Sequence, residues 1–282
     1  MPELSSDNLK SSTPTDDSVG VESLTVEQAI ANLQGEDDGL RYYAAWWLGK
    51  FRVREPEAIA ALTLALEDED NRTESGGYPL RRNAARALGK LGNCQVVPAL
   101  VHCLDCADFY VREAAAQSLG MLGDRIAIPG LMKLLAGGLE AAVRASGSPH
   151  LIQPYDAVIE ALGALGATEA IALIEPFLNH SVEAVKYAAA RAMYQLTQNP
   201  IYANLLIAAL KDERLQLRRT VLADLGAIGY LNAAEAIAQT LAENSLKLIS
   251  LKGLLEHQIN QTTPPSLSEG AIRVMTLMDA LL

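Results

Sequence analysis

Two arginines on one predicted helix face stand where they could bind carboxylates. Arg82 and Arg86 are four residues apart, so their side chains share one face of the helix. A guanidinium presents a planar fork of donors that meets a carboxylate with two hydrogen bonds. The pair therefore predicts a site for a ligand that carries carboxylates.

Aromatic residues occupy the equivalent positions of an earlier segment. Tyr42, Tyr43 and Trp46 lie in the run RYYAAWWLGK, which also contains the second tryptophan of the chain, Trp47. One helix cannot bury two adjacent indoles on a single narrow apolar face, so at least one should be exposed. Exposed rings near the two arginines could stack a flat conjugated ligand. The same rings could instead close the open end of a helical stack, and the sequence leaves both interpretations open.

Two carboxylates and a further tyrosine and arginine follow at the same positions of later segments. Asp156 and Glu160 are four residues apart on one predicted helix, and Tyr187 and Arg191 are four apart on the next. These positions escape the apolar face of their helices. We therefore expect all four side chains on the same surface as the arginines and the aromatic residues.

Several common catalytic and binding motifs are absent from the sequence. It contains no phosphate-binding loop, no Gly-x-Ser-x-Gly nucleophile turn and no His-Glu-x-x-His helix. His102, Cys103 and Cys106 lie close together but lack a second ligand pair at metal spacing. We therefore expect reduced thiols in an apolar environment and no metal site.

A repeat of about 31 residues must position these side chains. Six segments follow one template, in which an apolar residue and usually a base lead into small residues and end in Leu-Gly. They begin at Leu40, Leu80, Val111, Pro154, Val185 and Leu217. Each is followed by a second apolar helix, so the unit is a helical hairpin, and alanine pairs allow close helix packing. The predicted fold is an all-α, HEAT-like helical-hairpin solenoid (an alpha-alpha superhelix) of about six repeats.

The base of the template recurs as Arg41, Arg81, Arg112 and Arg218. A base at a fixed position of a repeat more often holds a stack together than binds a ligand. We therefore expect these arginines to make polar contacts from repeat to repeat, with acidic residues such as Asp108 among their partners.

Two segments exceed the period, and both lie at the same corner of the unit. They are residues 67–79 and 137–153. Insertions at equivalent corners lie on one edge of a solenoid, which is often its binding edge. A tolerated surface insertion is the alternative.

The ends of the chain differ from the repeats. Residues 1–23 are rich in Ser, Thr, Asp and Pro and are expected to form a disordered tail. The repeat array is expected to span residues 24–260, and residues 261–282 to hold a linker and a helix that caps the array or docks a partner. Ser266 and Glu269 have the spacing of a capping box before that helix.

Charge and hydropathy exclude two classes of partner. The formal net charge is -11 and the sequence pI is near 4.9, which disfavours nucleic acid. The sequence shows neither an export signal nor an apolar run of about 18 residues, so we expect a cytoplasmic protein without a membrane partner.

The segments LRRNAARALGKLG, RYYAAWWLGK and QPYDAVIEALGALG, together with the insertion ending YPLRRNA, resemble one family over roughly residues 24 to 260. It is the E subunit of the cyanobacterial E/F-type phycobilin lyases. The resemblance implies a heterodimer with a homologous F subunit. Together the two attach a bilin, with phycocyanobilin as the expected substrate and no cofactor, to a cysteine of the apo-phycocyanin alpha subunit through a thioether.

The surface residues fit the task that the resemblance implies, and their roles follow from their repeat positions and chemistry rather than from a motif of the family. Arg82, Arg86 or Arg191 would bind the propionates of the bilin. Tyr42, Tyr43 and Trp46 would contact its ring faces, with Tyr187 as a further ligand-binding candidate. Asp156 or Glu160 would contact the pyrrole N–H groups and act as catalytic carboxylates, because a carboxylate stabilises a protonated pigment. The alternative is a non-catalytic HEAT-repeat scaffold or a chaperone-like module for phycobilisome or other protein assembly.

Overall fold

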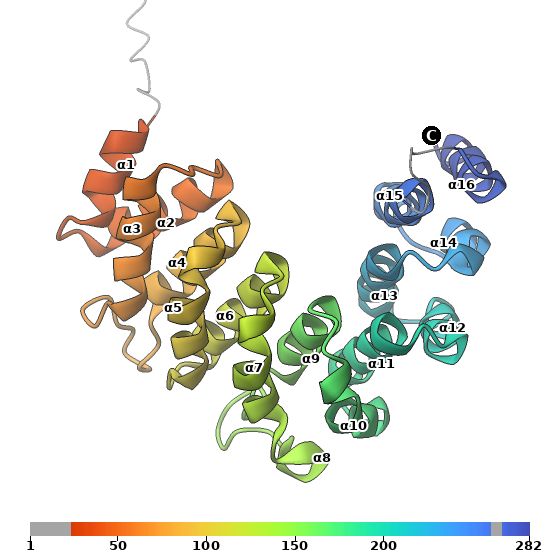
Figure 1. Cartoon of the computed structure of the whole chain (residues 1–282), viewed down its shortest axis with the longest axis horizontal. Helices are drawn as coiled ribbons and strands as arrows, with labels where there is room; N and C mark the ends of the chain where they lie inside the picture. Colours follow the sequence, from red (N-terminus) through yellow and green to blue (C-terminus); the bar gives the residue numbers. More distant parts are fainter. Residues whose placement is uncertain (1–23, 261–266) are drawn as a thin grey trace, which may run out of the picture.

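The computed structural model describes residues 24–260 and 267–282, which form an arc of stacked helical hairpins (Figure 1). The inner side of the arc carries α2 (Asp38–Lys50), α4 (Pro79–Leu91), α6 (Phe109–Leu122), α9 (Tyr155–Ala164), α11 (Glu183–Thr197), α13 (Leu215–Ile228) and α15 (Asn244–Asn260). The outer side carries α3 (Pro56–Leu64), α5 (Val97–His102), α7 (Ile128–Leu135), α10 (Ile171–Ile174), α12 (Pro200–Ala209), α14 (Ala234–Gln239) and α16 (Glu269–Asp279).

The remaining elements are short. α1 (Val26–Leu33) precedes the first hairpin, and α8 (Gly138–Ala141) lies in the second insertion. Turns of 3-10 helix adjoin several outer helices, at Ala65–Glu67, Cys94–Val96, Cys103–Asp105, Arg125–Ala127, Thr168–Ala170, Glu175–Asn179 and Leu231–Ala233. The prediction of an all-helical solenoid with about six hairpins, from α2 to α14, is confirmed. The proposed tail 1–23 and residues 261–266 of the proposed linker lie outside the described residues.

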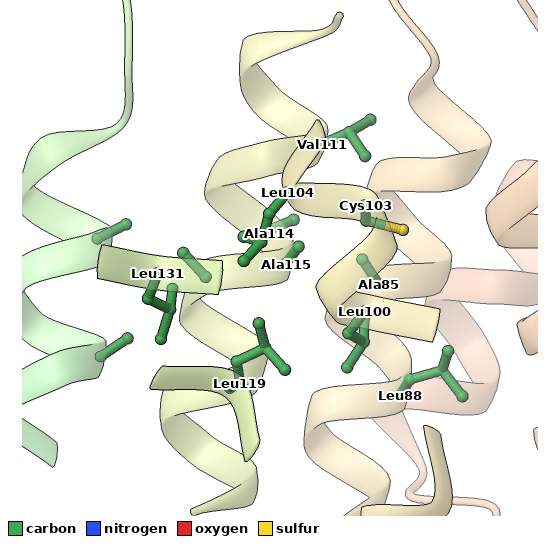
Figure 2. Close-up of a cluster of buried hydrophobic side chains, with 14 of the residues drawn as sticks. Ala85, Leu88, Leu100, Cys103, Leu104, Val111, Ala114, Ala115, Leu119 and Leu131 are labelled. Atoms are coloured by element: carbon green, nitrogen blue, oxygen red, sulfur yellow. The ribbon is translucent and has the colours of Figure 1, made fainter. Parts of the chain in front are cut away.

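Leucines from both rows of helices fill the space inside two consecutive hairpins, α4–α5 and α6–α7 (Figure 2). Leu88 and Leu119 come from inner helices, Leu100 and Leu131 come from outer helices, and all four are almost completely buried. Burying one such side chain contributes about 1.5–3 kcal/mol. The apolar stripes of the repeat thus form a core that continues from hairpin to hairpin as far as α11.

The glycine that ends each motif packs against a small residue of the next inner helix. A Cβ atom placed on Gly89 would lie 2.6 Å from the Cβ of Ser118, which is closer than two carbon atoms can approach. The same close approach joins Gly49 to Ala87, Gly120 to Ala161, Gly163 to Ala192 and Gly226 to Ser250. Adjacent inner helices therefore touch almost backbone to backbone.

One junction departs from this rule. Tyr194 takes the place of the glycine in the fifth repeat, and Asp224 takes the place of the small residue in the sixth. The Tyr194 ring packs edge-on against Tyr230, with 5.4 Å between the ring centroids. The buried residues beyond this junction form a second, separate hydrophobic cluster.

The repeated arginines link the hairpins, as predicted, and acidic side chains are among their partners, since Arg41 pairs with Asp68 and Arg81 with Glu69. Asp108 instead accepts from backbone N–H groups. Arg112 donates to the carbonyl oxygens of Cys106 and Ile152, at 2.6 and 2.8 Å, and so joins consecutive repeats. Arg218 likewise donates to the carbonyls of Asp212 and Leu241. Arg112 and Arg218 thus bind backbone carbonyls of the segments between helices, whereas Arg41 and Arg81 also bind carboxylates.

Arg112→Ala is expected to destabilise the fold by about 2–4 kcal/mol, because three carbonyls, of which that of Cys106 is part-buried, and the Gln153 side chain lose a charged donor. Urea unfolding followed by circular dichroism measures the change. Arg54→Ala is the matched control, since Arg54 is exposed, and it should stay within about 0.5 kcal/mol of the wild type. Equal stability of Arg112→Ala and the control would show that the repeated base does not support the stack.

The carboxyl-terminal helix α16 begins two residues later than the predicted capping box. Its N-cap is Ser268, whose hydroxyl accepts from the Ala271 N–H at 3.0 Å, so the helix does not start at the predicted N-cap, Ser266, which lies outside the described residues. A single serine accepting from the first turn is enough to start the helix. Ala271 and Val274 are buried against α14 and α15, so α16 covers the last hairpin. In the described ranges, no helix combines the length and apolar character needed to cross a bilayer.

Candidate functional site

The aromatic residues of α2 form an exposed patch on the inner side of the arc. Tyr42, Tyr43 and Trp46 are all exposed, Trp46 by 44%, and the Tyr43 and Trp46 rings lie 5.5 Å apart. Trp47 turns away and packs against Phe51. The prediction that the two indoles cannot share one buried face is confirmed. Because α1 covers the open end of the stack, the three rings are not needed there as a cap.

The two arginines of α4 differ in their partners. Arg86 lies 3.4 Å from a carboxylate oxygen of Glu113 on α6. Arg82 forms no ion pair with any carboxylate of residues 24–260 or 267–282, and its buried Nε has no acceptor there. Its guanidinium instead lies over the Tyr110 ring, 5.9 Å from the centroid. Arg82 is therefore the arginine that is better placed to receive a carboxylate from a ligand.

Arg191 lies between two carboxylates from neighbouring repeats. Its guanidinium is 3.3 Å from Glu160 on α9 and 3.2 Å from Asp224 on α13. The Glu160 side chain remains 37% exposed, whereas that of Asp224 is only 4% exposed. The structure thus brings Glu160 and Arg191 together and adds Asp224, which the sequence analysis missed. The sequence feature that could have revealed Asp224 is a carboxylate at a repeat position where the other repeats have alanine or serine.

Burial changes the protonation of this cluster. It raises the pKa of Glu160 to about 7, although Arg191 opposes the change. It also raises the pKa of Asp224, to about 6, and again outweighs the effect of Arg191. Removing a carboxylate from water disfavours its charged form, and here that effect exceeds the attraction of the shared guanidinium. Glu160 therefore exchanges its proton near neutral pH on a partly exposed surface.

Two further carboxylates lie close to the arginines of α4. Burial raises the pKa of Glu113, and the charge of Asp156 raises it further, while Arg86 and Arg82 lower it. Asp156 is half-buried on α9, one turn before Glu160. The predicted carboxylates of α9 therefore face the same side of the arc as the arginines of α4.

The expectation that Tyr187 belongs to this surface is wrong. Its side chain is only 9% exposed and packs in the second hydrophobic cluster, together with Leu206 of α12 and Leu217 of α13. The prediction assumed the same exposed position in every repeat. In this repeat the tyrosine instead belongs to the cluster that residues of α12 and α13 complete.

The two insertions lie at the same edge, as predicted, and they line a shared cavity of about 870 Å³. Phe109, Tyr110 and His150 contribute to its wall and were not among the predicted site residues. The signal that could have found them is an aromatic pair at the start of α6, between two insertions, with a histidine in the second insertion.

The cysteines lie away from this surface in differing environments. Cys103 is buried, and burial raises the pKa of its thiol to about 12, which makes it a weak nucleophile. Cys106 is partly buried, whereas Cys94 is exposed rather than buried in an apolar environment. In the part of the chain that the structure describes, no three His, Cys, Asp or Glu side chains gather in a metal-binding group.

Comparison with known proteins places this architecture among described families. The chain matches the description "HEAT repeats" over residues 73–147 and 155–225, and "PBS lyase HEAT-like repeat" over residues 40–68. It is 66% identical over 260 residues to the phycocyanobilin lyase subunit alpha of Nostoc sp., covering 92% of this chain and 94% of that relative. It is 67% identical over 264 residues to the protein of the same name from Microchaete diplosiphon, covering 92% and 90%.

A more distant relative and a solved structure agree with these matches. The bilin biosynthesis protein PecE of Nostoc sp. is 46% identical over 241 residues, covering 85% of this chain and 90% of that protein. A structure of the complex of CpcE and CpcF of phycocyanin lyase from Nostoc sp. aligns with a TM-score of 0.88 and 62% identity. That alignment covers 98% of this chain and 100% of the matched chain.

Proposed function

The chain belongs to the family of phycocyanobilin lyase alpha subunits, and on that premise we propose how its concave face handles the bilin. It is one subunit of a heterodimeric lyase, active with a CpcF-type partner, that attaches phycocyanobilin to the alpha subunit of phycocyanin. The non-catalytic scaffold is disfavoured because the relatives of similar length carry lyase names. We place its site of action in the cytoplasm.

The reaction adds a cysteine thiol across the ethylidene group of ring A. The sulfur–carbon bond forms while the carbon–carbon π bond opens, and the ring carbon that receives the electron pair takes up a proton. The thiol loses its own proton, so the addition needs no oxidant, reductant or leaving group. The lyase must therefore hold a flexible pigment in one conformation and exchange a proton beside it.

The position of Glu160 carries this assignment of roles: its carboxylate lies 3.3 Å from the Arg191 guanidinium and its side chain is partly exposed on the concave face. Its pKa of about 7 matches the pH at which a general acid or base works best. We assign to Glu160 the transfer of a proton to the bilin, and to Asp156 a contact with the pyrrole N–H groups. Arg191 then acts by holding Glu160 in place, rather than by binding a propionate.

The other groove residues would bind the pigment. We assign Arg82, with Arg86 as a second donor, to the propionate carboxylates. Tyr42, Tyr43 and Trp46 provide exposed ring faces on the same inner side of the arc. Their patch would support a flat ring by stacking, which contributes about 0.5–1.5 kcal/mol beyond the area that is buried.

The function is tested by mixing this chain, its CpcF-type partner, phycocyanobilin and apo-phycocyanin alpha subunit. A coloured alpha subunit that keeps its pigment on a denaturing gel is expected only when both lyase subunits are present. The same yield and the same absorption spectrum without this chain would contradict the proposed function.

A further inference from the structure

The cavity between the two insertions is formed largely by segments that lie outside the repeated helical hairpins. Residues 67–79 and 137–153 exceed the repeat, and both line its wall. The volume of about 870 Å³ lies within the range of about 300–1,000 Å³ that is typical of ligand pockets. Most of its wall is apolar or aromatic, with a few charged side chains among these residues.

The first turns of α6 fix both walls of the cavity. Asp108 accepts a hydrogen bond from the Tyr78 N–H, at the end of the first insertion, at 2.7 Å. Arg112 donates to the Ile152 carbonyl at 2.8 Å and to the Gln153 side chain at 2.9 Å, at the end of the second insertion. Two side chains of one helix thus hold the two loops at a defined separation.

The charges that line the cavity are unbalanced. Arg72 and Arg82 both contribute to the wall, and neither forms an ion pair with a carboxylate in the described ranges 24–260 and 267–282. The Nε of Arg82 is buried without an acceptor among these residues. Asp108 supplies one negative charge to the wall, against the three positive charges of Arg72, Arg82 and Arg112, and its two oxygens accept from the backbone N–H groups of Tyr78 and Tyr110 rather than from an arginine. Two guanidinium groups therefore remain available to an anionic ligand.

Flat rings lie beside these guanidinium groups. The Phe109 and His150 rings are stacked with their centroids 4.0 Å apart, and Tyr110 meets both edge-on, at 5.4 and 5.7 Å. Phe109 and His150 also line a second cavity, of about 260 Å³, whose wall includes Glu113 and Asp156. The stacked pair thus stands between the arginine-lined cavity and the carboxylates of the concave face.

We propose that the insertion cavity binds the propionate-bearing rings of the bilin, with Arg72 and Arg82 as the carboxylate ligands; Arg72 then takes the place of Arg86 as the second donor, because Arg86 already pairs with Glu113. The rest of the pigment then extends past the Phe109–His150 pair toward Asp156 and Glu160. This assignment rests on the proposed function and adds a binding site that the repeat pattern alone does not contain. A charge-assisted contact of this kind is stronger than a neutral hydrogen bond, and arginine suits a carboxylate because it can bind both oxygens.

The test compares phycocyanobilin with its dimethyl ester, which keeps the ring system but lacks both negative charges. Binding to the assembled lyase pair is followed by the change in pigment absorption. Arg72→Gln and Arg82→Gln should each weaken binding of the acid about tenfold to hundredfold. The ester should bind the wild type more weakly than the acid does, and neither substitution should weaken it further. Arg54→Gln, an exposed arginine outside the cavity, is the matched control and should leave both affinities unchanged.

A second variant tests the cavity without removing a charge. Ser148→Trp places an indole at the cavity wall and should weaken binding of both the acid and the ester. The proposal is overturned if the arginine variants bind the acid like the wild type, or if the ester binds the wild type as tightly as the acid. Covalent attachment by the wild-type pair is measured in parallel. Failure of that attachment contradicts the proposed function, whereas attachment with unchanged affinities in all variants contradicts the cavity and the assignment of Arg82 but leaves the lyase function standing.

Discussion

Arg191→Met is expected to lower the free energy of unfolding by about 3–5 kcal/mol, the usual cost of removing one partner from a buried ion pair. The loss arises at Asp224, whose side chain is 4% exposed and whose carboxylate has Arg191 as its ion-pair partner. Methionine keeps most of the volume of the arginine stem, so the loss of charge dominates the loss of packing. Urea unfolding of the chain with its partner absent measures the change.

The effect of Arg191→Met should depend on pH in a defined direction. Burial raises the pKa of Asp224 from 3.8 to about 6, so the folded chain holds this proton more tightly than the unfolded chain. The wild type therefore gains stability from this group at low pH and loses that contribution as the pH rises through about 6. Without Arg191 the pKa rises further, so the variant should lose most stability at pH 8 and least at pH 5.

A matched pair of variants separates burial from charge. Lys133→Met removes an exposed ion pair with Asp105 and should change stability by less than about 1 kcal/mol. Adding Asp224→Asn to Arg191→Met should restore part of the loss, because the variant then has no unpaired carboxylate in the core. An Arg191→Met protein as stable as the Lys133→Met protein at pH 8 would mean that Arg191 does not stabilise the junction.

The fold could be predicted because the same small residues recur at the same positions of each repeat, and these residues determine how adjacent helices pack. Every junction but one pairs a glycine with a small residue of the next inner helix, as Gly89 pairs with Ser118. The helix faces then follow from the period of the apolar residues. The exposure of Trp46 and the shared edge of the two insertions followed from the same reasoning. The local starts of helices were less certain, as the N-cap Ser268 illustrates.

The site could be predicted only in part because its contacts cross between repeats. The sequence pattern placed Glu160 and Arg191 on one surface, but a pattern within single helices cannot reveal that Asp224 completes their ion pair. Tyr187 was misplaced for the same reason, since it belongs to the cluster that residues of α12 and α13 complete. The insertion cavity depends on the conformation of two loops, and loops lack the periodic spacing of apolar residues from which helix faces can be predicted.

Glu160→Gln is expected to slow thioether formation about 100-fold to 10,000-fold, the usual contribution of a positioned general acid or base. Glutamine keeps the shape and some of the hydrogen bonding of the side chain but cannot give up its proton. Asp224 still neutralises Arg191 in this variant, so the fold should persist. Glu169→Gln, which changes an exposed carboxylate on another surface, should leave the rate unchanged.

The pH dependence identifies the role of Glu160 more sharply than the rate alone. Glu160 acts as an acid when protonated, and its pKa is about 7. The attacking cysteine acts as a thiolate, with an ordinary pKa of about 8.5. The rate follows the product of the fraction of Glu160 that is protonated and the fraction of the cysteine that is a thiolate. This product is nearly constant between the two pKa values and falls below the lower and above the higher one, which gives a bell-shaped pH profile.

The most direct test of the account is therefore the single-turnover rate of phycocyanobilin attachment as a function of pH, for the wild-type pair and for the pair with Glu160→Gln. The wild-type rate should fall again above about pH 8.5, and the variant should be slow, rising with thiolate formation and then staying level. A variant that retains the wild-type rate and the alkaline decline would contradict the claim that the concave face of this chain supplies the proton.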